Sequence, residues 1–367
     1  MRESLRRAGQ RVMIGFAGHA VSQDLRRLLR DYGAGGVVLF ARNVDAPEQV
    51  AELVREMQSV ARDAGHEQPL FVAVDQEGGR VARLREPWTR WPPLRAVGRT
   101  GSEDLARKMG EALAAELKAC GIRWDFAPVV DVDTNPRNPV IGDRSFGDDP
   151  ELVGRLGAAM VKGLQAGGVA ASAKHFPGHG DSDVDSHLAL PAIDHSLSRL
   201  EDVELRPFRA CIEAGVASIM TAHVVVREMD DERPATLSTE VVPRLLREKM
   251  KYDGVVVSDD LEMKAVAERW PARQAAVLAA KATCDVLLVC QDHDAQVEAI
   301  EGLVQAVETE EIAWKAMDAA CSRIRRLKER FLLPYEDPQP KAARLAAGVG
   351  ERWALSRELA ERGGITV

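Results

Sequence analysis

The segment KHFPGHGDSDVDSHLALP, residues 174–191, contains one lysine, three histidines and three aspartates. Its only aliphatic side chain between residues 177 and 186 is Val184, and Gly178 and Gly180 loosen its backbone. We therefore expect a polar loop that lies over a surface rather than in the core. Lysine, histidine and aspartate side chains transfer protons and bind polar ligands, so this loop is expected to border an active site.

Asp185 and His187 have the spacing of a proton-transfer pair. Residues two apart in an extended segment project to the same side, so the carboxylate can reach the imidazole. A paired carboxylate stabilises the imidazolium and fixes the orientation of the ring. His187 is therefore a candidate proton donor and acceptor near neutral pH. The alternative is a loop that is held together by its own hydrogen bonds.

The elements that must position these residues alternate between strands and helices. Eight near-continuous apolar strands between amphipathic helices predict an α/β fold, a (β/α)8 TIM-like barrel, with a doubly wound sheet as the rival fold. No GxGxxG or GxxxxGK motif follows an early strand, which argues against nucleotide binding. The predicted strands are VMIGF from 12, GVVLF from 36, FVAVD from 71, WDFAP from 124, VAASAKH from 169, SIMTAH from 218, GVVVSD from 254 and DVLLV from 285.

The barrel is expected to form a single catalytic domain over residues 1–333. Residues 334–367 begin with a proline cluster, PYEDPQP, and continue with a helical pattern. We expect this C-terminal extension to be helical and packed on the barrel, and too short to form a second domain.

Composition excludes several classes of protein. The chain has 367 residues, 46% of them hydrophobic, and a formal net charge of −8, which gives no electrostatic reason to bind nucleic acid or an anionic membrane. No apolar run approaches the roughly 18 residues of a membrane span, and the start MRESLRRAGQ is not followed by a signal peptide. Five cysteines without metal-type spacing are interpreted as packing residues in a reduced cytosol. We expect a cytoplasmic protein that uses no metal or cofactor.

Further candidates stand where the apolar runs end, because the active site of a (β/α)8 barrel lies at the carboxyl ends of its strands. Several strands thus direct polar groups at one mouth. These residues are Asp75, Arg80 and Arg83 after the third strand, Asp131 and Arg144 after the fourth, Lys174 and His175 at the fifth, His223 at the sixth, and Ser258, Asp259 and Asp260 at the seventh.

Some of these residues have a purely structural alternative. Asp259 with Glu262 three residues later also resembles a helix N-cap with its capping-box partner. DQEGGRVARLR, residues 75–85, is also compatible with a turn followed by surface ion pairs. His223 is interpreted as a hydrogen-bonded histidine near the barrel top. No role is assigned to His19, His66, His195 or His293.

Taken together, the motifs resemble family 3 glycoside hydrolases, and specifically their β-N-acetylglucosaminidase branch, whose bacterial members work in cell-wall recycling. The resemblance covers most of the barrel. It is carried by GVVLFARN at 36–43, VDQEGGRVARLR at 74–85, FAPVVDVD at 126–133, NPVIGDRSFG at 138–147, KHFPGHGDSDVDSHLALP at 174–191, MTAHV at 220–224 and VVSDDLEM at 256–263.

The resemblance implies a retaining hydrolase that releases terminal β-linked N-acetylglucosamine. It implies that Asp259 is the nucleophile that forms a covalent glycosyl-enzyme, and that His187, paired with Asp185, is first general acid and then general base. It also implies a set of residues that bind the hydroxyls of the sugar through charge-assisted hydrogen bonds. This set is Asp75, Arg83, Arg144, Lys174 and His175.

Related β-glucosidases take their acid/base from a second domain, and some N-acetylglucosaminidase relatives also carry an extra domain. We expect this chain to have neither, and its acid/base is therefore expected to come from the barrel, from Asp185 and His187. The loop that carries them is expected to close before catalysis and to behave as a mobile lid over residues 178–187.

Three alternative functions are also considered for these residues. A metal-dependent amidohydrolase also uses a barrel, but it needs an HxH pair after the first strand, where VMIGFAGHA offers only His19. A phosphorylase or β-glucosidase of the same family would use the same residues, since a histidine acid/base does not repel phosphate. A non-catalytic sugar-binding protein would have no need of Asp259, Asp185 and His187 together. The sequence predicts neither the group attached to the sugar nor the oligomeric state.

Overall fold

In the computed structural model, which describes residues 3–182 and 190–365, eight parallel strands close into a barrel. The order around the barrel is β1-β12-β11-β9-β7-β6-β3-β2. Each predicted apolar run overlaps one of these strands, so the predicted (β/α)8 barrel is confirmed. The strands are β1 (Val12–Ile14), β2 (Gly36–Leu39), β3 (Phe71–Val74), β6 (Trp124–Asp125), β7 (Ala170–Phe176), β9 (Ser218–Thr221), β11 (Val255–Asp260) and β12 (Val286–Val289).

Helices surround the barrel because each buries one apolar stripe against it. In α5 (Glu103–Ala119), Ser102 caps the first turn, and Leu105, Met109 and Leu113 are buried at a spacing of four. The other helices around the barrel are α1 (Glu3–Gln10), α2 (Gln23–Arg30), α3 (Pro47–Asp63), α4 (Leu94–Thr100), α6 (Pro150–Ala166), α7 (Leu197–Asp202), α8 (Leu205–Glu213), α9 (Lys264–Ala267), α10 (Ala272–Lys281) and α11 (His293–Glu308), with short helical segments η1 (Ala41–Asn43), η2 (Gly142–Arg144), η3 (Ala235–Leu237) and η4 (Val242–Lys249).

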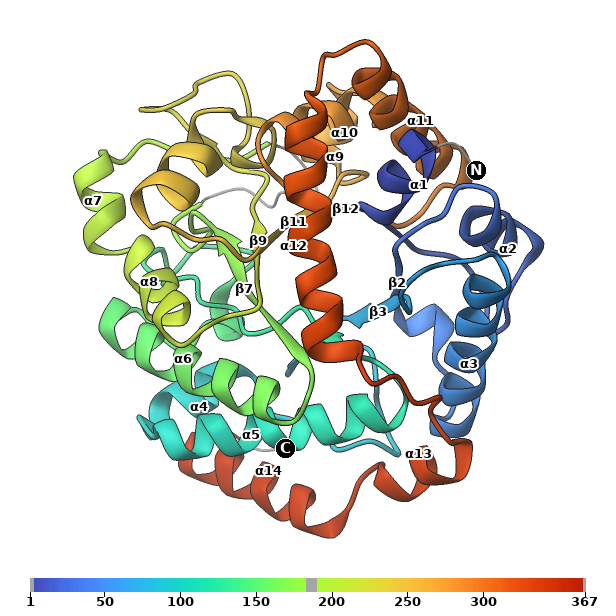
Figure 1. Cartoon of the computed structure of the whole chain (residues 1–367). Coiled ribbons are helices and arrows are strands. Elements are labelled where there is room, and N and C mark those ends of the chain that lie inside the picture. Colours follow the sequence, from blue (N-terminus) through green and yellow to red (C-terminus); the bar gives the residue numbers. More distant parts are fainter. Residues whose placement is uncertain (1–2, 183–189, 366–367) are drawn as a thin grey trace.

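The long helix α12 (Trp314–Leu332) lies across one end of the barrel (Figure 1). Its Ile324, Leu327 and Phe331 belong to one apolar cluster with the first residues of several barrel strands, among them Phe71 and Trp124. This helix therefore covers the amino-terminal end of the barrel. The opposite end, where the strands finish, is left for chemistry.

Two pairs of short strands lie beyond the carboxyl ends of barrel strands. β4 (Gln76–Gly78) and β5 (Val81–Ala82) form an antiparallel hairpin directly after β3. β8 (Ala192–Ile193) pairs in parallel with β10 (Val225–Val226). These additions belong to the mouth of the barrel and shape its surroundings.

The C-terminal extension contains α13 (Pro340–Ala346) and α14 (Gly350–Arg362). α13 packs against α3 and α5, and α14 packs against α4 and α5 (Figure 1). Gly348 N also donates a hydrogen bond to Glu116 Oε1 of α5 at 2.8 Å. The domain boundary at residue 333 stays a prediction.

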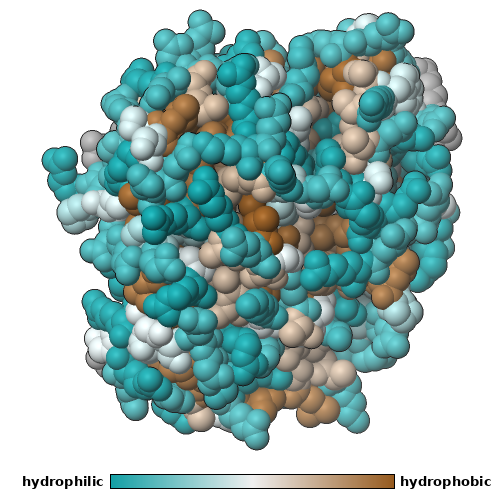
Figure 2. Space-filling view, turned by 60° about the vertical axis from the view of Figure 1, so that its left-hand side comes forward, coloured by the Kyte–Doolittle hydropathy of each residue, from teal (hydrophilic) through white to brown (hydrophobic). Residues whose placement is uncertain are grey.

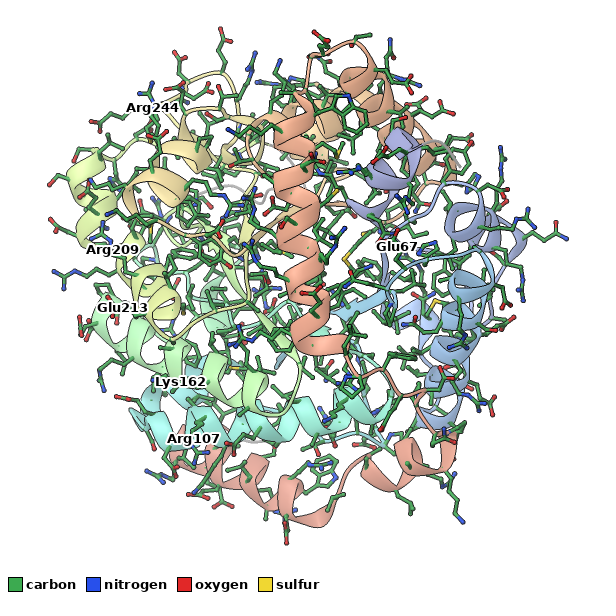
Figure 3. All side chains as sticks on the ribbon, viewed as in Figure 1. Glu67, Arg107, Lys162, Arg209, Glu213 and Arg244 are labelled. Carbon is green, nitrogen blue, oxygen red and sulfur yellow. The ribbon has the colours of Figure 1, made fainter. Side chains whose placement is uncertain are left out.

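Polar side chains cover most of the face in Figure 2, with apolar residues between them in small patches. Among the charged residues labelled in Figure 3, Lys162 of α6 and Glu213 of α8 are exposed on the outer helices. No helix within the described residues is long and apolar enough to cross a membrane. All five cysteines are free thiols and four of them are buried, as expected for packing residues.

Candidate active site

The carboxyl ends of the barrel strands surround a pocket of about 310 Å³. Three of the predicted site residues line it: Asp75 follows β3, Arg83 follows β5, and Asp259 belongs to β11. Closure of the barrel thus brings together residues from distant parts of the chain. Apolar side chains from other strand ends also line the pocket, namely Val38, Phe126, Met220 and Leu288.

Asp75 connects this pocket to buried charged residues. Its Oδ1 accepts a hydrogen bond from Lys174 Nζ at 2.7 Å, and its Oδ2 lies 3.5 Å from Arg83 Nη2. The Arg83 guanidinium also lies 5.9 Å from the centre of the Phe40 ring, within cation–π range. Asp75 is therefore held between two cations, of which Lys174 is buried and Arg83 faces the pocket.

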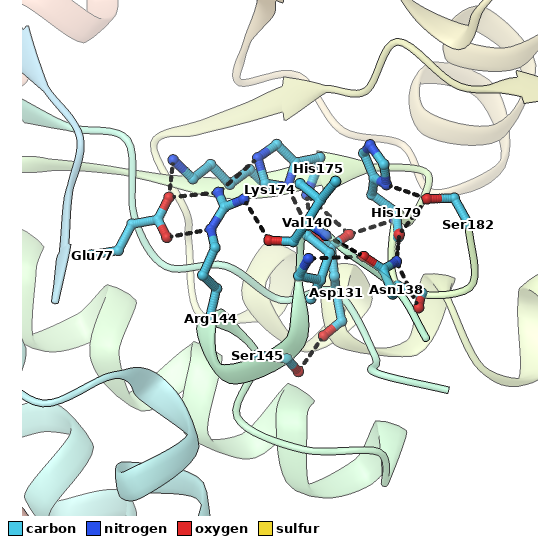
Figure 4. A network of polar contacts seen from close by, with 12 residues as sticks. Glu77, Asp131, Asn138, Val140, Arg144, Ser145, Lys174, His175, His179 and Ser182 are labelled. Atoms are coloured by element: carbon cyan, nitrogen blue, oxygen red, sulfur yellow. Dashed lines mark hydrogen bonds and ion pairs between the residues drawn. The ribbon is translucent and has the colours of Figure 1, made fainter. Parts of the chain in front are cut away.

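Glu77, a residue of the β4–β5 hairpin, is buried next to Arg144 and Lys174 (Figure 4). Its two carboxylate oxygens accept hydrogen bonds from Arg144 Nε and Nη2, both at 2.8 Å, and Lys174 Nζ lies 2.6 Å from Oε1. Burial acts to raise the pKa of Glu77, but Arg144 and Lys174 outweigh it and hold that pKa well below its usual value. The surface-ion-pair alternative applies to Arg80, which pairs with Asp143 in solvent, and not to Glu77.

Asp131 orients His175. The carboxylate accepts from His175 Nδ1 at 2.7 Å and lies 3.3 Å from the peptide nitrogen of the same residue. An ionised carboxylate only accepts hydrogen bonds, so Nδ1 carries the hydrogen. The other ring nitrogen, Nε2, faces Arg144 Nη2 at 3.4 Å. The His175 ring is therefore fixed in both orientation and tautomer.

Apart from the half-buried Asp181, the loop that follows β7 is buried up to residue 182, so its predicted position over the surface is wrong for this part. His179 N donates to Asp131 Oδ1 at 2.6 Å, and His179 Nδ1 lies 2.7 Å from Ser182 Oγ (Figure 4). Asn138 Nδ2 donates to the carbonyl of His179 at 2.7 Å. These partners remove the cost of burying polar groups. Burial lowers the pKa of His179 to about 4, so its ring is neutral near pH 7.

Asp259 lies at the edge of the pocket and is half-buried. Burial alone would raise the pKa of Asp259, but His223, His175 and the peptide N–H of Asp260 favour the anion, and the pKa lies below its usual value. His223 is buried and hydrogen-bonded, with Nδ1 2.8 Å from Thr236 Oγ1 and Nε2 2.9 Å from Asp260 O. This agrees with the interpretation of His223 as a satisfied histidine.

The capping alternative for Asp259 is wrong. Among the described helices, the next one after β11 is α9, which begins at Lys264, too far along the chain for Asp259 to be its N-cap. The side chain of Glu262 instead accepts hydrogen bonds from Gln291 N at 2.6 Å and Asp292 N at 2.8 Å. Glu262 therefore ties the β11 loop to the β12 loop, and the Asp259 carboxylate is left at the pocket.

The predicted acid/base pair, Asp185 and His187, lies outside the described residues. Asp181 and His195 stand on either side of this segment, and His195 Nε2 is hydrogen-bonded to Asp181 Oδ2. Thr134 Oγ1 donates to the other oxygen of Asp181 at 2.7 Å. His195, to which the sequence analysis assigned no role, therefore joins the chain before the segment to the chain after it.

Two buried carboxylates of this site are absent from the predicted set. The position of Glu77 could have been predicted from its spacing. It stands two residues after Asp75 in an extended segment, so its side chain projects to the same side as that of Asp75. Asp131 was a strand-end candidate but was not included among the sugar-binding residues. Within residues 3–182 and 190–365, no group of three or more His, Cys, Asp or Glu side chains is arranged to hold a metal ion.

Comparison with known proteins places the chain among glycosidases. The model of the family "Glycosyl hydrolase family 3 N terminal domain" matches residues 6–327. β-Hexosaminidase A of Pseudoalteromonas piscicida is 36% identical over 359 residues, which cover 92% of this chain and 60% of that protein. The chain therefore spans less than two thirds of the length of this relative.

Solved structures give the same result. A glycoside hydrolase family 3 β-N-acetylglucosaminidase from Paenibacillus sp. str. FPU-7 superposes with a TM-score of 0.92 at 39% identity, over 99% of this chain and 69% of the other. NagZ from Neisseria gonorrhoeae, solved in complex with N-trifluoroacetyl-D-glucosamine, superposes with a TM-score of 0.80 at 32% identity. This match covers 96% of this chain and 98% of the other.

Proposed function

The chain belongs to glycosyl hydrolase family 3 and is of the β-hexosaminidase type, and from this premise we propose that it releases terminal β-linked N-acetylglucosamine with retention of configuration. The observation that carries the proposal is the placement of Asp259, an anion at the edge of a pocket whose other charged residues include Asp75 and Arg83. An ionised carboxylate is the form that attacks an anomeric carbon.

The reaction has two steps. In the first, Asp259 bonds to the anomeric carbon while the bond to the leaving oxygen breaks, and that oxygen takes a proton from His187. In the second, His187 removes a proton from water, the water oxygen bonds to the anomeric carbon, and Asp259 departs. Asp185 stabilises the protonated imidazole before the first step and again after the second. The roles of Asp185 and His187 are supported by the family resemblance.

The hydroxyls of the sugar are bound by charged residues around Asp259. Asp75 and Arg83 line the pocket, and Lys174, Arg144 and His175 belong to the network behind Asp75. Charge-assisted hydrogen bonds are short and directional, so sugars that lack a matching hydroxyl leave charged groups unpaired and are rejected. The complex of the Neisseria gonorrhoeae relative with an N-acylated glucosamine supports a sugar of this class.

We further propose that the natural substrates are cytoplasmic peptidoglycan fragments in cell-wall recycling, because the resemblance is to the bacterial branch with that role. An N-acetylglucosaminyl-anhydromuramic acid, with and without peptide, is compared with a chitin disaccharide as substrate. Faster hydrolysis of the chitin disaccharide would contradict this assignment and leave the reaction type intact.

The test of the reaction compares an aryl N-acetyl-β-glucosaminide with the aryl β-glucoside, with and without phosphate. We expect preference for the N-acetylated substrate, no dependence on phosphate, and a product that first forms as the β-anomer in NMR spectra. Release of a sugar 1-phosphate would favour the phosphorylase alternative. A product that first forms as the α-anomer would refute the double-displacement mechanism.

A further inference from the structure

Glu77 occupies the centre of the charged network without lining the pocket. Its side chain is 1% exposed, and it contacts two cations that come from different parts of the fold, Arg144 in η2 and Lys174 in β7. Through these two cations it is one contact away from Asp75 and His175. Four of the five predicted sugar-binding residues are therefore linked to one buried carboxylate.

In this network two carboxylates, Glu77 and Asp75, pair with three cations, and Glu77 pairs with two of them. Lys174 and Arg144 are like charges that share the Glu77 carboxylate, and Arg83 adds a third cation beside Asp75. Lys174 is 2% exposed and Arg144 is 10% exposed, so water screens their repulsion poorly. Without the charge of Glu77, Asp75 alone would face three cations.

The backbone around Glu77 is held firmly in place. The side chain of the preceding residue, Gln76, accepts hydrogen bonds from Arg83 N at 2.8 Å and Leu84 N at 3.0 Å and donates to Leu84 O at 2.9 Å. Gly78, the following residue, has φ 99°, and a Cβ there would lie 2.6 Å from Pro92 O. The Glu77 side chain therefore starts from a fixed point and has a short reach to both cations.

We propose that Glu77 is a positioning residue, which does not touch the sugar but fixes Arg144 and Lys174 where they bind its hydroxyls. The inference rests on the proposed function. A bidentate carboxylate restrains the guanidinium in its plane, and the same carboxylate limits the motion of the lysine. A site held in this way needs no rearrangement when the sugar enters.

The test replaces Glu77→Gln, which keeps the shape and removes the charge. The matched control is Asp285→Asn at the closed end of the barrel, where a buried carboxylate also pairs with two arginines, Arg247 and Arg323. Three quantities are measured for each variant: the inhibition constant of N-acetylglucosamine, kcat and KM for the aryl N-acetyl-β-glucosaminide, and Tm.

In Glu77→Gln we expect the inhibition constant to rise and kcat/KM to fall, each by on the order of 10-fold to 10²-fold, with the pH dependence of kcat unchanged because Glu77 transfers no proton. In Asp285→Asn we expect a lower Tm, while the inhibition constant and kcat/KM stay near those of the wild type. The changes in the inhibition constant caused by Glu77→Gln and by Arg144→Lys are expected to be non-additive in the double variant, because Glu77 acts through Arg144.

An inhibition constant in folded Glu77→Gln equal to that of the wild type would overturn the inference. If Glu77→Gln does not fold, Glu77→Asp is measured, which keeps the charge but is too short to contact both cations, and there too an unchanged constant overturns it. A wild-type chain that binds N-acetylglucosamine without cleaving the glycoside contradicts the proposed function instead, and the binding comparison still tests Glu77.

Discussion

The Nδ1 atom of His175 and the carboxylate of Asp131 form a 2.7 Å hydrogen bond inside the barrel mouth. The other oxygen of the same carboxylate accepts the peptide N–H of His179 at 2.6 Å. Both oxygens of Asp131 are thus used as acceptors. One buried carboxylate thereby orients a predicted sugar-binding histidine and anchors the loop that follows it.

The first prediction concerns Asp131→Asn. An amide has only one acceptor oxygen. Either the hydrogen bond from the peptide N–H of His179 is therefore lost, or the His175 ring must move its hydrogen to Nε2, toward Arg144. We expect kcat/KM to fall on the order of 10²-fold with the fold retained. Imidazole nitrogen NMR shifts report the tautomer. The control is Asp133→Asn, whose carboxylate pairs with Arg95; an equal loss there would contradict the assignment.

Removal of the proposed nucleophile is the second prediction. Asp259→Ala is expected to lower kcat on the order of 10⁴-fold or more, the scale seen when a catalytic nucleophile is deleted. A slow fluorinated N-acetylglucosaminide should label Asp259 in the wild type, detected by mass spectrometry of peptides. A label on another side chain would show that the nucleophile lies elsewhere.

The third prediction separates the acid from the base role of His187. Protonation of the leaving oxygen matters most when that oxygen is basic, so His187→Ala should slow alkyl glycosides far more than aryl glycosides with acidic leaving groups. The steady-state rates of a leaving-group series measure this directly. A uniform loss across the series would indicate that His187 is not the general acid.

Asp260, next to the nucleophile, gives a prediction on stability and pH. Burial raises the pKa of Asp260 to about 7, above its ordinary value of about 3.9. The folded state therefore binds this proton more strongly than the unfolded state, and the stability that it contributes is lost as pH rises from about 4 to about 7. In Asp260→Asn, the difference in Tm between pH 5 and pH 8 should be smaller than in the wild type. An unchanged difference would assign that pH dependence to other groups.

Lys328 of α12 gives the opposite dependence at the closed end of the barrel. Burial lowers the pKa of Lys328 to about 7, below its ordinary value of about 10.4, so the unfolded state binds the proton more strongly. The resulting loss of stability is complete below pH 7 and disappears as pH rises toward 10. Lys328→Met, which gives up one hydrogen bond to Gln10, should raise Tm more at pH 6 than at pH 9. Activity toward the aryl substrate should be unchanged, because α12 covers the end opposite the pocket.

The barrel was readable from the sequence because its strands are continuous apolar runs and their ends are polar. Each of the eight runs, from VMIGF to DVLLV, overlaps a strand of the barrel. The rule that barrel chemistry lies at the carboxyl ends then selected Asp75, Lys174 and Asp259, three residues that the structure places around one mouth. The local hydrophobic pattern and the rule on strand ends were sufficient to predict the barrel and these three residues.

The hydrogen-bond and ion-pair partners of Asp75, Lys174 and Asp259 could not be predicted from the sequence in the same way. Glu77 belongs to a charged segment whose composition is equally compatible with buried and with surface ion pairs. The structure contains one of each kind, since Glu77 pairs with Arg144 in the interior and Arg80 pairs with Asp143 at the surface. The loop after β7 has the composition of an exposed loop, yet its polar groups are buried because Asp131 and Asn138 accept and donate within the mouth.

The sequence by itself therefore determined the barrel, its family and the charged residues at the strand ends, since periodicity and composition act within short stretches of chain. Only the tertiary structure decided which carboxylate holds which cation, which histidine tautomer is fixed and which end of the barrel is closed. Those outcomes depend on residues that are far apart in the chain, such as Glu77 and Arg144, which are hydrogen-bonded, or Phe71 and Phe331, which belong to one apolar cluster. Such contacts exist only once the barrel has closed and excluded water from its mouth.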